Sequence, residues 1–332
     1  MDRGVRASSR PGARRAAPRM NGALVSVVVE TITARFDSTT GSLANDLQAT
    51  LDGIARQTYP RDRIETIVVI DENVSSGTVT ELRQRYPDVK FVSSNASNYF
   101  AAKNAGAAAS SGDFIALLDG DCVPAADWLE VLFSRFEDDV AAVAGCTRYE
   151  GRSLTARTFS IPDFAYVHGE DDGASGFNIN NLAFRRAVLL GHPFDARIRR
   201  NGGCYFLFHQ LRAAGARIVY EPRATVAHGL DIRGLGFARK HFDRGYDGVV
   251  VYRLDEQAVL RGTRLFRRLG AAALPAIYAR RLFIDWARMV RHRRQIGIAL
   301  LALPYFVMVS AATRSIELAG ALTAATHGKT PA

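Results

Sequence analysis

The chain has 332 residues, 48% of them hydrophobic, and a formal net charge of +10, a composition typical of a globular protein. The charge is uneven, because residues 1–22 carry +5 and residues 261–294 carry +9, which leaves −4 for the rest. A slightly acidic core disfavours a nucleic-acid enzyme, whose basic groove would lie on the core itself. The three cysteines lack metal-site spacing and form no disulfide framework, which is typical of a reducing compartment.

The first 22 residues are polar and rich in arginine, and they contain no apolar stretch. They therefore do not resemble a secretory signal, and we expect a disordered basic tail. Translation could begin at Met1 or at Met20, and the sequence leaves this open.

Strands and helices alternate between residues 23 and 150. Predicted strands cover 23–31, 64–70, 89–92, 114–118 and 140–146, and predicted helices cover 42–57, 78–86, 97–110 and 126–136. This alternation predicts an α/β fold with a doubly wound, mostly parallel sheet. Beyond residue 151 the pattern loosens, with helices expected at 185–190 and 204–214 and short strands at 218–220 and 224–227.

Residues 236–332 have a different character and are expected to form a membrane-associated, basic and apolar helical region. Residues 261–268 are basic and amphipathic, residues 280–294 interleave arginines with apolar side chains, and residues 296–313 carry no charge. Eighteen such residues are at the lower limit for a membrane span. Spanning, re-entrant, interfacial and buried soluble helices all stay open. The arginines before the run would lie in the cytoplasm, so we expect the cytoplasmic face of the plasma membrane.

Two carboxylates follow the apolar segment Phe114–Leu118. Asp119 and Asp121 stand at the carboxyl end of a buried strand, where open α/β sheets bind ligands. Both can converge on one hard divalent cation, with phosphate oxygens completing its coordination. The sequence therefore predicts a substrate that bears a diphosphate.

Five segments in this order make residues 24–230 resemble a family 2 glycosyltransferase of the GT-A fold. They are VSVVVETIT, LDGIARQTYPRDRIETIVVIDEN, AAKNAGAAASSGDFIALLDGDCVPAADWLE, FNINNLAFRR and LRAAGARIVYEPRATVAHG. The resemblance implies a catalytic domain over residues 23–235, between the tail and the helical region.

The resemblance implies an inverting, hexosyltransferase-type enzyme that uses Mg²⁺ or Mn²⁺. It would move a sugar from a nucleotide-diphosphate donor to a glycan or lipid-linked acceptor, at a membrane and without nucleic acid as a partner. The resemblance implies that Glu30, Thr31 and Asp71 line the pocket of the nucleotide base. Lys103 and Asn104 would lie near the ribose and the phosphates, and Asp119 would face the ribose or the metal. Asp121 and His228 would bind the metal.

The chain departs from the family at the catalytic base. Gly203 and Cys204 occupy the place of the family's Glu-Asp pair. Cys204 is a poor base, because an unperturbed thiol has a pKa of about 8.5. The nearest substitute carboxylates belong to Glu170, Asp171 and Asp172, which also fit a solvated acidic loop. The identity of the base is therefore left open.

Alternative functions follow from the same residues. A membrane-docked pseudo-transferase would bind a nucleotide sugar without turnover, as the missing base suggests. The string LLDGDCV also fits a haloacid-dehalogenase-like phosphatase, with Asp119 as nucleophile and Asp121 as acid, but that signature belongs on the first strand of its domain. A sugar-nucleotide pyrophosphorylase would need a glycine-rich loop, and TITARFDSTT contains no glycine. Nucleic-acid binding through the basic tails would show steep salt dependence.

Overall fold

The computed structural model describes residues 22–32, 42–95, 98–150, 157–161, 167–169, 172–229 and 234–327. The predicted disordered tail, apart from residue 22, lies outside these residues, as do Glu170 and Asp171.

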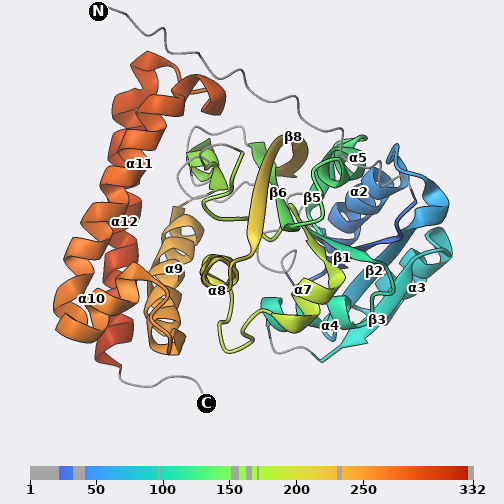
Figure 1. The fold of residues 1–332 in the computed structure, drawn as a ribbon, viewed down its shortest axis with the longest axis horizontal. Coiled ribbons are helices and arrows are strands. Elements are labelled where there is room, and N and C mark those ends of the chain that lie inside the picture. The colour runs from blue at the N-terminus through green and yellow to red at the C-terminus, as the bar shows by residue number, and fades with distance from the viewer. Residues whose placement is uncertain are drawn as a thin grey trace, which may run out of the picture.

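A single sheet of eight strands forms the centre of the described part of residues 22–229 (Figure 1). Its spatial order is β3-β2-β1-β4-β7-β6-β8-β5. The strands are β1 (Val25–Glu30), β2 (Ile64–Asp71), β3 (Lys90–Ser94), β4 (Phe114–Asp119), β5 (Cys122–Pro124), β6 (Val140–Glu150), β7 (Leu182–Arg185) and β8 (Arg217–Gly229). The neighbours β3, β2, β1 and β4 are parallel, and β6 is parallel to β8, whereas β7 and β5 run antiparallel to their partners.

The second half of the sheet differs from the sequence-based expectation. The two short strands predicted at 218–220 and 224–227 are one continuous strand, β8, whose pairing with β6 shifts register between Gly145 and Cys146. The strands β5 and β7 were not predicted, because segments of three and four residues are too short to display a two-residue period.

Alternating side chains of the strands build two apolar layers, one on each face of the sheet. In β1, Val28 faces one layer, and Val25, Val27 and Val29 face the other. The first layer is covered by α4 (Tyr99–Ala108), α7 (Arg186–Gly191) and α8 (Gly203–Ala213), and the second by α2 (Leu43–Ala55), α3 (Ser76–Arg85) and α5 (Trp128–Phe133). The helix α4 packs closely on β1, since a Cβ atom at Gly106 would lie 2.2 Å from Val28 Cγ1.

Four C-terminal helices stand beside the sheet domain and contact it through α8 and α9 (Figure 1). They are α9 (Gly234–Leu254), α10 (Arg261–Leu269), α11 (Leu274–Ile296) and α12 (Leu303–Thr326). Helices α9 and α12 approach to backbone contact, because Gly245 faces the Glu317 carbonyl and Gly320 faces the Phe242 carbonyl. A Cβ atom at either glycine would lie within about 2 Å of that carbonyl oxygen.

A buried ionic network ties these helices together. Arg314 of α12 donates to Asp285 of α11 at 2.7 Å and also pairs with Glu317. On α9, His241 Nδ1 lies 2.9 Å from Glu317 Oε1 and donates to it, since a carboxylate only accepts. The network links α9, α11 and α12, and loss of one partner would leave the buried carboxylate of Asp285 or Glu317 without its counter-charge.

The uncharged run at 296–313 does not form one helix. Gly297 ends α11 in the left-handed conformation with φ of 76°, and α12 begins six residues later. Within the described residues, the C-terminal helices offer no stretch with the length and apolar character that a bilayer crossing requires. Side chains on both sides of the break stay exposed, including those of Leu300 and Leu301.

Candidate functional site

Acidic side chains gather at the carboxyl edge of the parallel strands. The strand β1 ends at Glu30, β2 at Asp71 and β4 at Asp119, and all three side chains are buried. The parallel register pairs Glu30 directly with Asp119. The edge is the one where open α/β sheets bind ligands, as the sequence predicted for Asp119.

A buried clamp holds the carboxylate of Asp119. Lys103 Nζ lies 2.8 Å from its Oδ1, and the Tyr99 hydroxyl donates to the same carboxylate at 2.8 and 3.1 Å. Both donors project from α4, four residues apart and therefore on one helical face. Lys103 was expected near the ribose and phosphates, and the structure places its ammonium directly on Asp119. Asp119 therefore presents an oriented carboxylate to whatever occupies the edge.

Pairing of β5 with β8 brings Asp121 and His228 together. Cys122 is the register partner of His228, so the residue that precedes β5 faces the end of β8. His228 Nε2 lies 3.8 Å from Asp121 Oδ2, and both side chains are buried. His228 Nδ1 lies 3.1 Å from the Gly229 carbonyl oxygen and must donate to it, which leaves the Nε2 lone pair facing Asp121.

The donor set of Asp121 and His228 fits a divalent cation. A separation of 3.8 Å is too long for a hydrogen bond, and two ligand bonds of about 2.1 Å would span it. The hydrogen bond at Nδ1 fixes the tautomer that a metal-binding histidine needs. Cys122 Sγ lies within 4.8 Å of the same atoms. The site therefore offers a carboxylate, an imidazole and a neighbouring thiol, of which the carboxylate and the imidazole suit Mg²⁺ or Mn²⁺ better than sulfur does.

The residues expected at the nucleotide base occupy the neighbouring strand ends. The Thr31 hydroxyl accepts from the Asp71 backbone N–H at 2.9 Å, which ties the end of β1 to that of β2. Asp71 Oδ1 accepts from the backbone and side chain of Asn73 at 2.7 and 2.6 Å. The amide of Asn104, which was expected near the ribose and phosphates, exchanges two hydrogen bonds with the backbone of Phe194.

The position of the expected base contains a thiol at the start of α8. Cys204 borders the same cavity as Asp119 and His228, and burial raises the pKa of its thiol to about 12. Gly203 cannot gain a side chain there, since a Cβ atom would lie 2.4 Å from the Phe100 ring. Cys204 thus borders the cavity, but its thiol stays protonated at neutral pH and cannot act as a base there.

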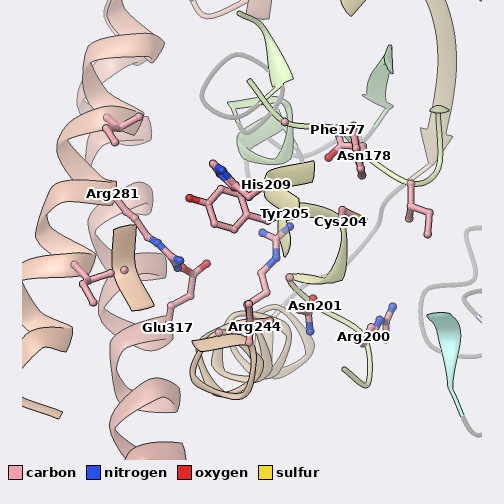
Figure 2. Close-up of a pocket in the computed structure, with 18 of the residues that line it drawn as sticks. Phe177, Asn178, Arg200, Asn201, Cys204, Tyr205, His209, Arg244, Arg281 and Glu317 are labelled. Carbon is pink, nitrogen blue, oxygen red and sulfur yellow. The ribbon is translucent and has the colours of Figure 1, made fainter. Parts of the chain in front are cut away.

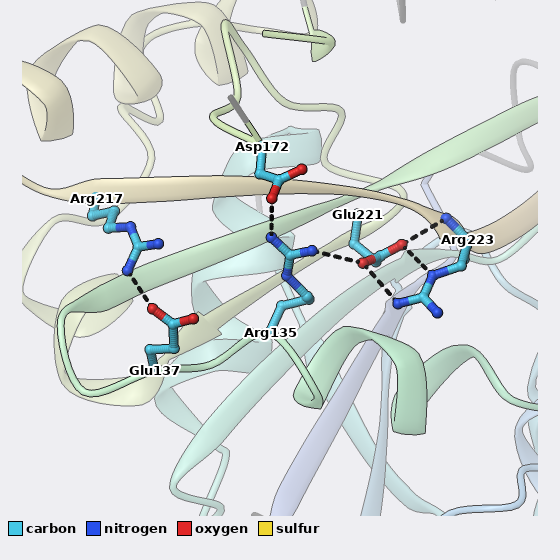
Figure 3. Close-up of polar contacts among 6 residues, drawn as sticks. All are labelled: Arg135, Glu137, Asp172, Arg217, Glu221 and Arg223. Carbon is cyan, nitrogen blue, oxygen red and sulfur yellow. Dashed lines mark hydrogen bonds and ion pairs between the residues drawn. The ribbon is translucent and has the colours of Figure 1, made fainter. Parts of the chain in front are cut away.

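Asp172 lies outside the residues that border this cavity. Its carboxylate faces Arg135, with 3.4 Å between Oδ2 and Nη2, and Arg135 also pairs with Glu221 at 3.2 Å (Figure 3). Glu221 in turn accepts from Arg223. This chain of charges holds the bend of Asp172, whose φ is 64°, against the sheet. Glu170 and Asp171 lie outside the residues that the structure describes.

A cavity of about 860 Å³ connects the sheet edge to the C-terminal helices (Figure 2). Asp119, His228 and Tyr99 border its sheet side. Its other side is formed by helices α8 to α12, which contribute the labelled residues Tyr205, His209, Arg244, Arg281 and Glu317. The volume is large enough for a ligand of drug size or larger. Helices that the sequence associated with a membrane therefore also complete the site.

Sequence reasoning missed Tyr99, the second donor to Asp119. The sequence did indicate it, because Tyr99 precedes Lys103 by four residues in a helix capped by Asn98 and therefore shares a helical face with Lys103. The cavity-facing residues of α9 to α12 carried no comparable signal, because their approach to α8 depends on helix packing between distant segments.

The chain is similar to known proteins in its sequence. Residues 39–190 match the family model described as Glycosyl transferase family 2. The chain is 31% identical over 191 residues to the succinoglycan biosynthesis protein ExoM of Rhizobium meliloti, covering 54% of this chain and 62% of that protein. It is 25% identical over 202 residues to the glucosyl-dolichyl phosphate glucuronosyltransferase of Haloferax volcanii, covering 54% and 63%. The chain thus spans less than two thirds of the length of these relatives.

Two solved structures share the fold. One is described as the mannosyltransferase PcManGT from Pyrobaculum calidifontis in complex with GDP-Man and Mn²⁺, with a TM-score of 0.61, 18% identity and coverage of 94% of this chain and 90% of that one. The other is described as GalNAc-T7 with UDP, GalNAc and Mn²⁺, with a TM-score of 0.53, 13% identity and coverage of 74% and 50%. The family resemblance seen in the sequence is confirmed, and the fold is that of these glycosyltransferases.

Proposed function

We propose that this chain, whose residues 39–190 belong to glycosyl transferase family 2, is a metal-dependent, inverting glycosyltransferase of the hexosyltransferase type. Its donor would be a nucleotide-diphosphate sugar, and its acceptor a glycan or a lipid-linked glycan. The observation that carries the proposal is the buried pair of Asp121 and His228, of which His228 borders a large cavity together with an oriented Asp119.

The residues divide the work according to their positions. Asp121 and His228 would hold Mg²⁺ or Mn²⁺, which as a Lewis acid neutralises the charge that develops on the departing diphosphate. Asp119, oriented by Lys103 and Tyr99, would accept hydrogen bonds from the donor's ribose. Glu30, Thr31 and Asp71 would border the nucleotide base. The acceptor hydroxyl would then attack the anomeric carbon from the opposite face.

Exposed apolar and cationic side chains support association with a membrane. The side chains of Phe283, Val290, Leu300, Leu301 and Met308 are more than half exposed on α11, on α12 and on the segment between them. Arg291 and Arg294 are exposed on the same part of α11. Apolar groups beside arginines suit an interfacial position on an anionic bilayer. We propose that the enzyme lies at the cytoplasmic face of the plasma membrane, and the exposed side chains support its contact with a bilayer.

Membrane attachment can be tested by flotation with vesicles. The full chain should float with vesicles containing anionic phosphatidylglycerol and much less with neutral phosphatidylcholine. The variant Leu300→Glu/Leu301→Glu should lose flotation, and the control Leu322→Glu, which changes a leucine near the other end of α12, should keep it. Flotation that is equal for wild type and the double variant would rule out this attachment surface.

A thermal-shift screen against UDP, GDP and dTDP, with and without Mn²⁺, tests the donor site. One nucleotide should raise the melting temperature more with Mn²⁺ than with a chelator. Release of nucleoside diphosphate from a panel of nucleotide sugars then tests turnover. No metal-dependent shift with any nucleotide would refute the proposed site.

A second candidate function is a pseudo-transferase that binds a nucleotide sugar without turning it over. It is favoured by Cys204, whose thiol stays protonated where the family carries a carboxylate base. The two functions share the thermal shift and differ in turnover. Replacement of Cys204 by aspartate would discriminate further, because a gain of turnover shows that the missing base was the limitation. The family match and the fold disfavour the phosphatase alternative.

A further inference from the structure

The cavity carries more positive charge than a nucleotide-sugar site requires. Its border includes two carboxylates, Asp119 and Glu317, and seven cationic side chains, namely Arg200, Lys240, Arg244, Arg261, Arg280, Arg281 and Arg314. Glu317 is engaged by Arg314, and Asp119 by Lys103. A donor diphosphate would bring about two negative charges, which a bound divalent cation already balances. The excess of positive charge therefore favours a second anionic group.

The arginines concentrate on the helical side of the cavity. Arg261 opens α10, and Arg280 and Arg281 are consecutive on α11. All three border the same cavity as Tyr205 of α8. Within the part of the chain that the structure describes, Arg261 and Arg280 make no hydrogen bond or ion pair, and Arg281 donates to the Tyr252 hydroxyl at 3.0 Å.

An apolar wall adjoins these arginines. Along α11, Ala276, Ile277, Arg280, Arg281 and Ile284 border the cavity, a spacing that places them on one helical face. Val259 and Leu265, which flank Arg261, continue the apolar surface. The same face thus offers cations at its middle and apolar side chains on both sides, which suits a ligand with an anionic group and a hydrocarbon chain.

We propose that the helical side of the cavity binds the phosphate or diphosphate of a lipid-tailed acceptor, with Arg261, Arg280, Arg281 and Tyr205 on the phosphate and Val259, Leu265 and Ile277 on the tail. The proposal rests on the proposed function, since it names the class of acceptor. Arginine suits this role because its planar guanidinium binds phosphate oxygens in pairs. The acceptor's phosphate would anchor its sugar end toward Asp119 and His228 on the sheet side.

Binding of farnesyl diphosphate to the full chain in a chelating buffer tests the anion site without the metal site. Calorimetry should detect binding that is at least tenfold tighter than that of inorganic diphosphate and of farnesol. The variant Arg280→Gln/Arg281→Gln should weaken it by at least about tenfold, the loss expected for one charge-assisted contact. Arg261→Gln should act in the same direction.

The matched control is Arg291→Gln/Arg294→Gln, which removes two exposed arginines of α11 that do not border the cavity. It should change the affinity less than twofold, and Asp121→Asn should also leave it unchanged. Unaltered binding by the Arg280/Arg281 variant, or loss of binding in Asp121→Asn, would overturn the proposal. If inorganic diphosphate binds as tightly as farnesyl diphosphate, the tail does not contribute to binding. If farnesol binds as tightly as farnesyl diphosphate, the phosphate groups do not contribute. Either result would refute the proposed site.

The two proposals fail separately in this design. Binding of farnesyl diphosphate requires neither the metal nor turnover. A protein that binds it but shows no turnover would therefore refute the proposed catalysis and leave the phosphate site standing. Transfer of sugar to an unphosphorylated glycan, if its kcat/KM is the same in wild type and in Arg280→Gln/Arg281→Gln, would support the proposed catalysis. The same result would refute the phosphate site.

Discussion

Replacing Lys103 by methionine would remove the cation that neutralises buried Asp119. The side chain of Lys103 is fully buried, and its ammonium lies 2.8 Å from Asp119 Oδ1. Methionine preserves most of the apolar stem, so the packing of α4 changes little. The variant therefore isolates the charge from the volume.

The expected loss of stability follows from the geometry. At 2.8 Å and an effective dielectric constant of about 20, the attraction is roughly 6 kcal/mol before desolvation is counted. Removing one partner of such a buried pair costs about 3–5 kcal/mol. Lys103 also donates to the Leu118 carbonyl, and loss of that bond adds about 1 kcal/mol. Tyr99 still donates to Asp119 in the variant and limits the damage.

The double variant Lys103→Met/Asp119→Asn separates charge burial from the rest. An asparagine can still accept from Tyr99 and leaves no buried charge, so the double variant should be only about 1–2 kcal/mol less stable than wild type. Urea unfolding in a chelating buffer measures both. Turnover should be lost in both variants, because each disrupts the oriented carboxylate. A single variant within 1 kcal/mol of wild type, or a double variant no more stable than the single one, would refute the reasoning.

Three further predictions test other parts of the structure. Asp121→Asn and His228→Ala should each reduce the nucleotide-induced thermal shift in Mn²⁺ to its level in chelator, and a retained Mn²⁺ increment would place the metal elsewhere. Cys204→Ser should change kcat/KM less than about threefold between pH 7 and 9, because a thiol with a pKa of about 12 is not a base there, and a larger loss would give the thiol a catalytic role. Burial alone would raise the pKa of Glu317, but Arg314 and the hydrogen bond from His241 outweigh it and lower the pKa. The ionised carboxylate of Glu317 therefore stabilises the fold fully above about pH 4.3, and this stabilisation is lost as the pH falls toward the folded-state pKa. Glu317→Gln should lower the free energy of unfolding by about 3–5 kcal/mol at pH 7 and by progressively less below pH 4. An equal loss at pH 7 and at pH 3 would contradict this.

The parallel half of the sheet could be read from the chain. The segments Val25–Glu30 and Phe114–Asp119 are mostly apolar, as buried parallel strands are, and the structure has a strand at each predicted place, with bounds that differ by one or two residues. The position of Asp119 at a strand end followed from the same pattern. The antiparallel strands β5 and β7 could not be predicted, since their residues are set by pairing with β8 and β4 rather than by their own periodicity.

The site itself was only partly predictable. The end of a predicted strand indicated Asp119, because parallel strands present their carboxyl ends at one edge, whereas Glu30 and Asp71 came from the family resemblance. The pairing of Asp121 with His228 came from the family resemblance, and the structure explains it by the register of β5 on β8. The hydrogen bond of Asn104 to Phe194 and the ion pair of Asp172 with Arg135 could not be predicted from the sequence.

The sequence by itself determined a buried strand with a pair of carboxylates at its tip, since an apolar run ends there in Asp-Gly-Asp. Only the tertiary structure decided what surrounds them. Arg280 and Tyr205 are far apart along the chain, and they border one cavity because α9 and α12 pack at glycine contacts beside α8. Local patterns encode the periodicity of a single element, whereas a cavity between elements depends on how several surfaces fit together, and that information is spread over the whole chain.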